Sequence, residues 1–168
     1  AILAGDGLLT LAFERMLGSS HPRALAAAKA VAARAGLGGM VGGQTLDIAY
    51  TGQALQRGVI ERMQEGKTAA LFMAALEAGL LLSGADERQL AAGTEYAYGF
   101  GRAFQIIDDL LDLTGDKAQL GKTPGKDEAE GKWTWPAMVG ADQARKDAES
   151  WTLYAVDALR SFGQEIGR

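Results

Sequence analysis

The stretch Phe104-Gln105-Ile106-Ile107-Asp108-Asp109-Leu110-Leu111-Asp112 sets three carboxylates and one amide into an otherwise apolar segment. At the helical spacing of about 100° per residue, the polar side chains all share an arc of about 100°. The members of this polar face are Gln105, Asp108, Asp109 and Asp112. The five apolar side chains fill the rest of the circumference. The pattern therefore predicts a helix that is buried on most sides and acidic on one.

Carboxylates that lie together in a cleft lose hydration and repel one another, and a divalent cation relieves both penalties. Mg²⁺ takes oxygen ligands, commonly one or two protein carboxylates together with waters and substrate phosphates. Asp108 and Asp112, one helical turn apart, are suitably spaced to bind such ions from the protein side. The alternative interpretation of the same residues is a solvated acidic stripe on a surface helix.

Length and composition predict one all-α domain spanning residues 1–168. The chain is 48% hydrophobic, which is ample for a core of several helices. It contains no cysteine, which excludes disulfides and thiolate metal sites and is typical of a reducing compartment, so we expect a cytoplasmic location. The net charge of −4, with lysines spread among acids, argues against a nucleic-acid partner.

The chain is not expected to span a membrane or to be secreted. Its longest apolar region, Leu71 to Ala85, contains Glu77 and is too short to cross a bilayer. The region from Ala1 to Leu17 lacks a basic leader and contains acids, which does not fit a secretory signal.

Apolar residues recur every three and four positions throughout, with no sustained alternation, so the pattern predicts helices and no sheet. The expected helices span residues 1–17, 22–36, 38–54, 56–83, 86–114 and 142–162. Two glycine pairs repeat at four-residue spacing: Gly38/Gly42 and Gly39/Gly43. They allow close approach of another helix, or leave room for a ligand beside Gln44 and Asp47.

The segment from residue 115 to residue 132 is a polar, glycine- and lysine-rich loop that follows the acidic helix. Part of it resembles a phosphate-binding P-loop, but five residues instead of four separate its glycines, and a helix instead of a strand precedes it. We therefore reject a Walker nucleotide site. Its Lys122, Lys126 and Lys132 suit an anion that arrives with its own metal, and a solvated linker is the alternative.

Several motifs in order make the chain resemble the trans-isoprenyl diphosphate synthases, the family of farnesyl and geranylgeranyl diphosphate synthases. FQIIDDLLDLTGD at 104–116, followed by GKTPGKD at 121–127 and GKWTWP at 131–136, resembles the second aspartate-rich region of that family. Upstream, residues 2–14 resemble the helix after the first aspartate-rich motif. GGMVGGQTLD at 38–47 resembles the glycine-rich active-site helix, and GKTAALF at 66–72 the Lys-Thr motif.

The resemblance implies an isoprenoid synthase-type helical bundle around a central active-site cleft. It also implies a homodimer and an Mg²⁺-dependent prenyltransferase, which condenses an allylic diphosphate with isopentenyl diphosphate. By analogy, three acids bind Mg²⁺: Asp108, Asp109 and Asp112, with Asp127 in support. Three lysines contact diphosphate: Lys67, Lys122 and Lys132. Thr68 and Gln105 offer oxygen dipoles to the allylic cation. Gln44 and Asp47 line the cleft, although with Thr68 they also suit simple helix packing.

The first aspartate-rich motif of the family, its adjacent arginines and the helices before it are absent from this sequence. We therefore expect a bundle that is incomplete at the N-terminus and a chain that is inactive by itself. Two hypotheses follow: a prenyltransferase whose N-terminal part is missing, or a non-catalytic partner subunit that modulates a complete synthase. The retained second motif favours the first. A terpene cyclase is not expected to carry the Lys-Thr and GKxxGKD elements in this order.

Overall fold

The computed structural model describes residues 1–114 and 133–163, and these residues form helices and no strand. The all-α prediction is confirmed for them. The helices are α1 Ile2–Leu17, α2 Ala24–Ala35, α3 Met40–Ala49, α4 Arg57–Gln64, the π-helical turn η1 Glu65–Ala69, α5 Ala70–Ser83, α6 Glu87–Thr114, α9 Trp135–Val139, α10 Ala141–Ala158 and α11 Arg160–Gly163.

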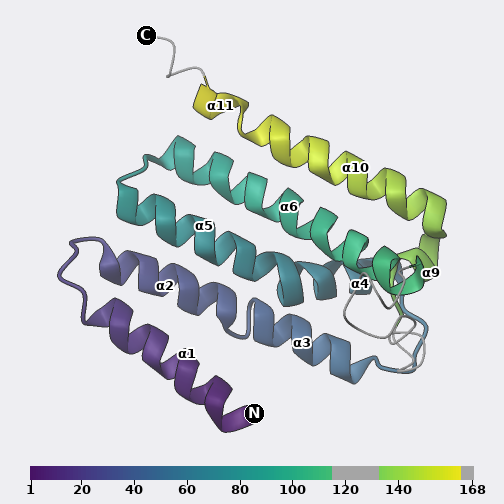
Figure 1. The fold of residues 1–168 in the computed structure, drawn as a ribbon, viewed down its shortest axis with the longest axis horizontal. Coiled ribbons are helices and arrows are strands. Elements are labelled where there is room, and N and C mark those ends of the chain that lie inside the picture. Colours follow the sequence, from purple (N-terminus) through teal and green to yellow (C-terminus); the bar gives the residue numbers. More distant parts are fainter. Residues whose placement is uncertain (115–132, 164–168) are drawn as a thin grey trace.

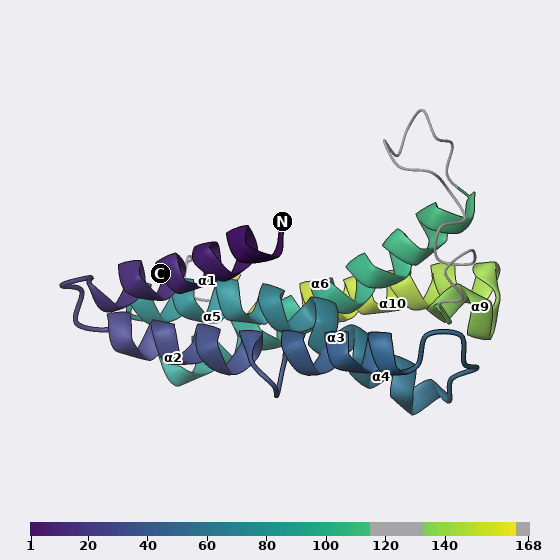
Figure 2. The same cartoon turned by 90° about the horizontal axis from the view of Figure 1, so that it is seen from below.

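The long helices lie side by side in a row, in the order α1, α2, α5, α6 and α10 (Figure 1). Seen from below, α3 and α4 continue this shallow row beyond α2 and α5, and one end of α6 rises out of it (Figure 2). Helix α1 packs against α2 and has no buried residue. Large apolar side chains such as Leu8 and Leu9 are consequently exposed on the described surface.

The hairpin between α5 and α6 follows directly from local sequence. Gly84 ends α5 in the left-handed conformation, with φ of 87°, which glycine adopts without a steric penalty. Asp86 then begins α6 with a reciprocal cap: its carboxylate accepts from the Gln89 N–H at 2.8 Å, and the Gln89 side chain accepts from the Asp86 N–H at 3.0 Å. This turn places α6 antiparallel to α5 and brings the acidic stretch opposite η1.

Three of the predicted boundaries need correction. The helix expected over 38–54 ends at Ala49, because the chain turns through Gly52, whose φ is 78°. The helix expected over 56–83 contains the π-helical turn η1, which divides it into α4 and α5. The helix expected over 142–162 is also divided, by a turn at Leu159. The short helix α9 was not predicted, since its five residues are too few for a periodic pattern.

Close backbone contacts hold η1 between α3 and α6. A Cβ added to Gly43 of α3 would lie 2.0 Å from the Lys67 nitrogen, and one on Gly101 of α6 would lie 2.5 Å from the Ala69 Cα. Close helix packing is therefore confirmed for Gly43, which faces Gly66 and Lys67, whereas a Cβ on Gly39 would lie 1.8 Å from the Arg34 carbonyl oxygen at the end of α2. Gly38 has no heavy atom within 4 Å of such a Cβ, so it does not share this packing.

Two stretches, Ala24–Ala49 and Arg57–Ser83, are long and apolar enough to cross a membrane by length and composition alone. This is weak evidence, because core helices of soluble proteins meet the same criterion. Both stretches are interrupted in the structure, the first between α2 and α3 and the second at η1. The first stretch carries Asp47 and the second carries Lys67, and these two charged side chains form an ion pair.

Candidate functional site

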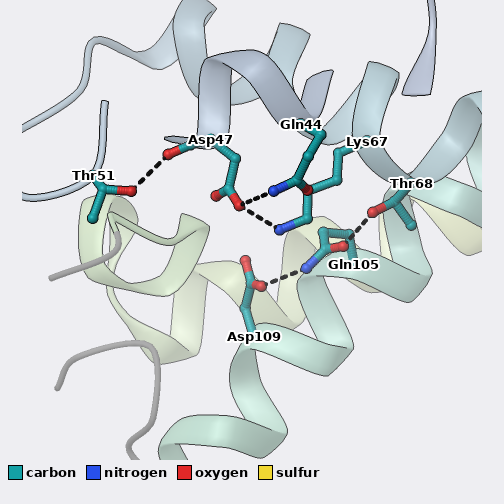
Figure 3. Close-up of polar contacts among 7 residues, drawn as sticks. All are labelled: Gln44, Asp47, Thr51, Lys67, Thr68, Gln105 and Asp109. Atoms are coloured by element: carbon teal, nitrogen blue, oxygen red, sulfur yellow. Dashed lines mark hydrogen bonds and ion pairs between the residues drawn. The ribbon is translucent and has the colours of Figure 1, made fainter. Parts of the chain in front are cut away.

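The π-helical turn η1 presents Lys67 and Thr68 to two different helices. Figure 3 shows Lys67 directed to Asp47 of α3 and Thr68 directed to Gln105 of α6. A π turn holds one residue more than an α turn, and such turns occur frequently at functional sites. The structure thus brings together five residues that the sequence singled out: Gln44, Asp47, Lys67, Thr68 and Gln105.

One carboxylate oxygen of Asp47 accepts hydrogen bonds from two donors. Lys67 Nζ lies 2.7 Å from Asp47 Oδ2, and Gln44 Nε2 donates to the same oxygen at 3.4 Å. The Asp47 side chain is 10% exposed, whereas that of Lys67 is 35% exposed. Asp47 therefore holds the ammonium group from the protein side, and part of the lysine remains open to an anion from solvent.

A second hydrogen-bonded chain runs from Thr68 through Gln105 to Asp109. The Thr68 hydroxyl donates to Gln105 Oε1 at 2.5 Å, and Gln105 Nε2 donates to Asp109 Oδ1 at 2.7 Å. The hydroxyl hydrogen of Thr68 is thus engaged with Gln105. The lone pairs of the Thr68 hydroxyl oxygen and those of the Gln105 carbonyl oxygen form the electron-rich part of this chain.

The Asp109 carboxylate accepts hydrogen bonds from three described residues. Besides Gln105, its carboxylate accepts at Oδ2 from Gln64 Nε2 at 3.1 Å and from the Trp135 backbone N–H at 3.3 Å. Asp109 is 4% exposed and Gln64 is 3% exposed. The sequence interpretation missed Gln64 and gave Trp135 no role, although a glutamine in the middle of an amphipathic helix is a recognisable signal.

The predicted burial of the acidic helix needs correction. Asp109 and Asp112 are buried, and Asp108 is half-buried, so the acidic face points into the molecule. Among the apolar residues, Ile106 and Leu110 are buried, but Phe104, Ile107 and Leu111 are 49%, 44% and 43% exposed. Helices α5 and α10 flank α6, with η1 and α9 also in contact, and Phe104, Ile107 and Leu111 lie on a side of α6 that these helices leave partly open. At about 100° per residue, Asp108 lies nearest to that open side and Asp109 farthest from it.

The residues of this helix fit Mg²⁺ that binds together with a diphosphate. Within residues 1–114 and 133–163, no group of three or more histidine, cysteine, aspartate or glutamate side chains could hold a metal ion by itself. The donors are oxygens, as Mg²⁺ requires, and one or two carboxylates suffice when phosphate oxygens and waters complete the shell. The remaining predicted residues, Asp127, Lys122, Lys126 and Lys132, lie outside the described residues.

An aromatic surface borders the polar chain. Phe72, one turn after Thr68, contacts Phe100 at a ring-centroid distance of 4.9 Å and Phe104 at 5.3 Å. Phe100 is 40% exposed, and Phe104 is the direct neighbour of Gln105. The sequence interpretation did not identify this surface. The four-residue spacing of Phe100 and Phe104 was the available signal.

Comparison with known proteins shows that the chain is similar to synthases of isoprenoid diphosphates. The sequence pattern described as "Polyprenyl synthetase" matches residues 1–160. The chain is 39% identical to farnesyl diphosphate synthase of Escherichia coli (strain K12), over 98% of this chain and 57% of that protein. It is 36% identical to geranylgeranyl pyrophosphate synthase 11, chloroplastic, of Arabidopsis thaliana, over 98% of this chain and 48% of that protein.

The fold of the chain is also similar to that of solved structures. A crystal structure of geranyltransferase from Helicobacter pylori, complexed with magnesium and isoprenyl diphosphate, superposes with a TM-score of 0.85 at 30% identity. The match covers 95% of this chain and 53% of that one. The chain thus spans about half the length of the proteins it matches.

Proposed function

The chain belongs to the polyprenyl synthetase family, and we propose that the complete protein is an Mg²⁺-dependent prenyltransferase. It would condense an allylic diphosphate with isopentenyl diphosphate. The observation that carries this proposal is the π-helical turn η1, which directs Lys67 to Asp47 and the next residue, Thr68, to Gln105. That arrangement combines a cation for a diphosphate with electron-rich oxygens for a carbocation.

Lys67 binds the diphosphate of the allylic substrate. When the C–O bond breaks, its electron pair leaves with the diphosphate, so negative charge grows on the phosphate oxygens. A cationic group that is already in place stabilises this charge without further reorganisation. The ion pair with Asp47 keeps Lys67 in position before the substrate arrives. Gln44 supports Asp47 through its amide.

Thr68 and Gln105 stabilise the allylic cation that remains. Their oxygens are polar, but neither is an ionised nucleophile that would trap the cation. The double bond of isopentenyl diphosphate then attacks the cation, and a proton is lost to regenerate an alkene. The product is an allylic diphosphate that is one isoprene unit longer.

Mg²⁺, when bound, would place positive charge near the diphosphate oxygens and so assist the departure of the diphosphate. Asp108 and Asp112 are the residues we assign to hold it; the sequence resemblance also implied Asp109, whose role is considered separately below. Lys122 and Lys132 are proposed to contact the diphosphate, with Asp127 in support.

The aromatic surface of Phe72, Phe100 and Phe104 suits the hydrocarbon part of the substrate. Its exposed rings lie next to the polar chain, so an apolar tail can leave water there while its diphosphate stays near Lys67. Burying apolar surface contributes about 25 cal/mol per Å², so such a tail is a substantial source of binding free energy.

A homodimer is proposed from the family resemblance, and a cytoplasmic location from the lack of cysteine. The two relatives named above are synthases, which gives no advantage to the alternative of a non-catalytic partner subunit.

Incorporation of labelled isopentenyl diphosphate into longer allylic products tests the proposal. Thr68→Val removes the hydroxyl at nearly constant volume, so we expect turnover to fall about 10²-fold, as for other preorganised dipoles, with little change in KM. Thr94→Val is the matched control, because the Thr94 hydroxyl donates to the Leu90 carbonyl of its own helix and to no other described residue. If the Thr68 variant turned over as fast as the Thr94 variant, the carbocation role of Thr68 would be wrong.

A further inference from the structure

We propose that Asp109 is a positioning residue, which fixes the Gln105 amide with its oxygen toward Thr68, and that it is not one of the Mg²⁺ ligands. This inference rests on the proposed function, because it explains which end of Gln105 faces the carbocation. The geometry behind it is the sequence of bonds from Trp135 and Gln64, through Asp109 and Gln105, to Thr68.

One oxygen of Asp109 accepts a hydrogen bond from a group that can only donate. Oδ2 accepts from the Trp135 backbone N–H, and a backbone amide has no alternative orientation. Trp135 is itself anchored, since the residue is 1% exposed and its Nε1 donates to Asp147 at 2.8 Å. The guanidinium carbons of Arg57 and Arg102 lie 5.1 and 5.7 Å from the centre of that ring.

The carboxylate also sets the orientation of Gln64. The Gln64 amide nitrogen donates to Asp109, and its buried Oε1 has no hydrogen-bond partner among the described residues. Leaving a buried carbonyl oxygen without a donor costs about 1–3 kcal/mol. Rotating the amide by 180° would instead place that oxygen against a negatively charged oxygen. Gln64 therefore takes the orientation that the charge of Asp109 demands.

Gln105 is oriented by the same charge. An ionised carboxylate only accepts hydrogen bonds, so Asp109 Oδ1 requires the Nε2 end of Gln105, and the carbonyl end is left for Thr68. The Thr68 hydroxyl can both donate and accept, so it would tolerate either end of the amide. Asp109 therefore decides that an oxygen, and not an N–H group, accompanies Thr68 at the carbocation.

Asp109→Asn isolates this effect because it keeps the shape of the side chain. The Trp135 N–H requires an oxygen at the Oδ2 position, so the new amide nitrogen takes the Oδ1 position. Two amide nitrogens would then face one another, and Gln105 would rotate to present its carbonyl to Asn at position 109. Its Nε2 group would now face Thr68, with the positive edge of the amide toward the cation.

The test compares turnover with metal-dependent binding in the complete polypeptide that carries these residues. For Asp109→Asn we expect kcat to fall about 10²-fold, with the Mg²⁺ midpoint of pyrophosphate binding, measured by calorimetry, unchanged within about twofold. Asp108→Asn is the positive control, expected to shift that midpoint about tenfold or more because it weakens a direct ligand. Asp142→Asn, on an exposed residue of α10, is the neutral control. A shifted midpoint for Asp109→Asn, with kcat restored at saturating Mg²⁺, would overturn the proposal.

A rescue experiment tests the orientation without relying on catalysis. In Asp109→Asn/Gln105→Glu, the new carboxylate at position 105 can accept from the Asn amide at position 109 and from Thr68. The hydrogen-bonded chain is thus restored, with the carboxylate and the amide having exchanged positions. We expect this double variant to be more stable than the sum of the two single variants predicts, because they interact directly. The NH₂ resonance of Gln105 should also move upon Asp109→Asn. Additive stabilities with an unmoved resonance would refute the positioning role. Coupling without any prenyl transfer would refute only the proposed function.

Discussion

Gly43→Ala should separate the two elements that form the site. A Cβ at this position would lie 2.0 Å from the Lys67 nitrogen, 2.6 Å from the Gly66 carbonyl carbon and 2.8 Å from the Lys67 Cα. All three are backbone atoms, so no side chain can move aside, and α3 must shift away from η1. Overpacking of this kind costs about 1–3 kcal/mol of unfolding free energy.

The same shift should affect catalysis, because Asp47 on α3 holds Lys67 on η1 across this contact at 2.7 Å. A misplacement of about 1 Å in such a site can lower the rate about 10²-fold. Denaturant unfolding measures the first effect, and kcat/KM for isopentenyl diphosphate incorporation measures the second.

Gly79→Ala provides the matched control for Gly43→Ala. Gly79 lies within α5, and a Cβ there would meet no heavy atom within 4 Å. The same substitution at this helical position should therefore stabilise the protein by about 0.5–1 kcal/mol, through the helix propensity of alanine. If the two variants had equal unfolding free energies, or if Gly43→Ala kept full activity, the close packing of α3 on η1 would not control the site.

Two further predictions concern ligand binding. Lys67→Ala should weaken pyrophosphate binding by about 1.5–3 kcal/mol, the range for hydrogen bonds to charged groups, whereas Lys29→Ala on the exposed surface of α2 should leave it unchanged; calorimetry measures both. Mg²⁺ and pyrophosphate should each raise the affinity of the protein for the other by the same factor, because binding linkage is reciprocal. Equal pyrophosphate affinities with and without Mg²⁺ would contradict a joint metal and diphosphate site.

The sequence predicted the helices well where periodicity was long and the ends carried local signals. The helix expected over 86–114 is present as α6, and Gly84 with Asp86 supplies the turn before it. The short helix α9 could not be predicted, since five residues do not establish a period. The π-helical turn at Glu65–Ala69 was not predicted either. It packs closely against glycines of α3 and α6, and such contacts between distant parts of the chain cannot be inferred from periodicity.

The candidate site was predicted in its members but not in its internal connections. The motif resemblance identified Lys67, Thr68 and Gln105, and the structure joins Thr68 to Gln105 directly. Periodicity placed Asp108 and Asp109 on one face, but it could not order them by depth. That order depends on which neighbouring helices cover α6, and such tertiary contacts leave no trace in the spacing of one helix.

A crystal structure of the complete polypeptide with Mg²⁺ and an unreactive thio-analogue of an allylic diphosphate tests the central claim most directly. Our account predicts that the diphosphate contacts Lys67 and that Mg²⁺ is held by Asp108. The first carbon of the allyl group should face the Thr68 hydroxyl and Gln105 Oε1, with Gln105 Nε2 still bonded to Asp109. A diphosphate bound away from Lys67, or an allyl group that does not approach the Thr68–Gln105 pair, would contradict the account.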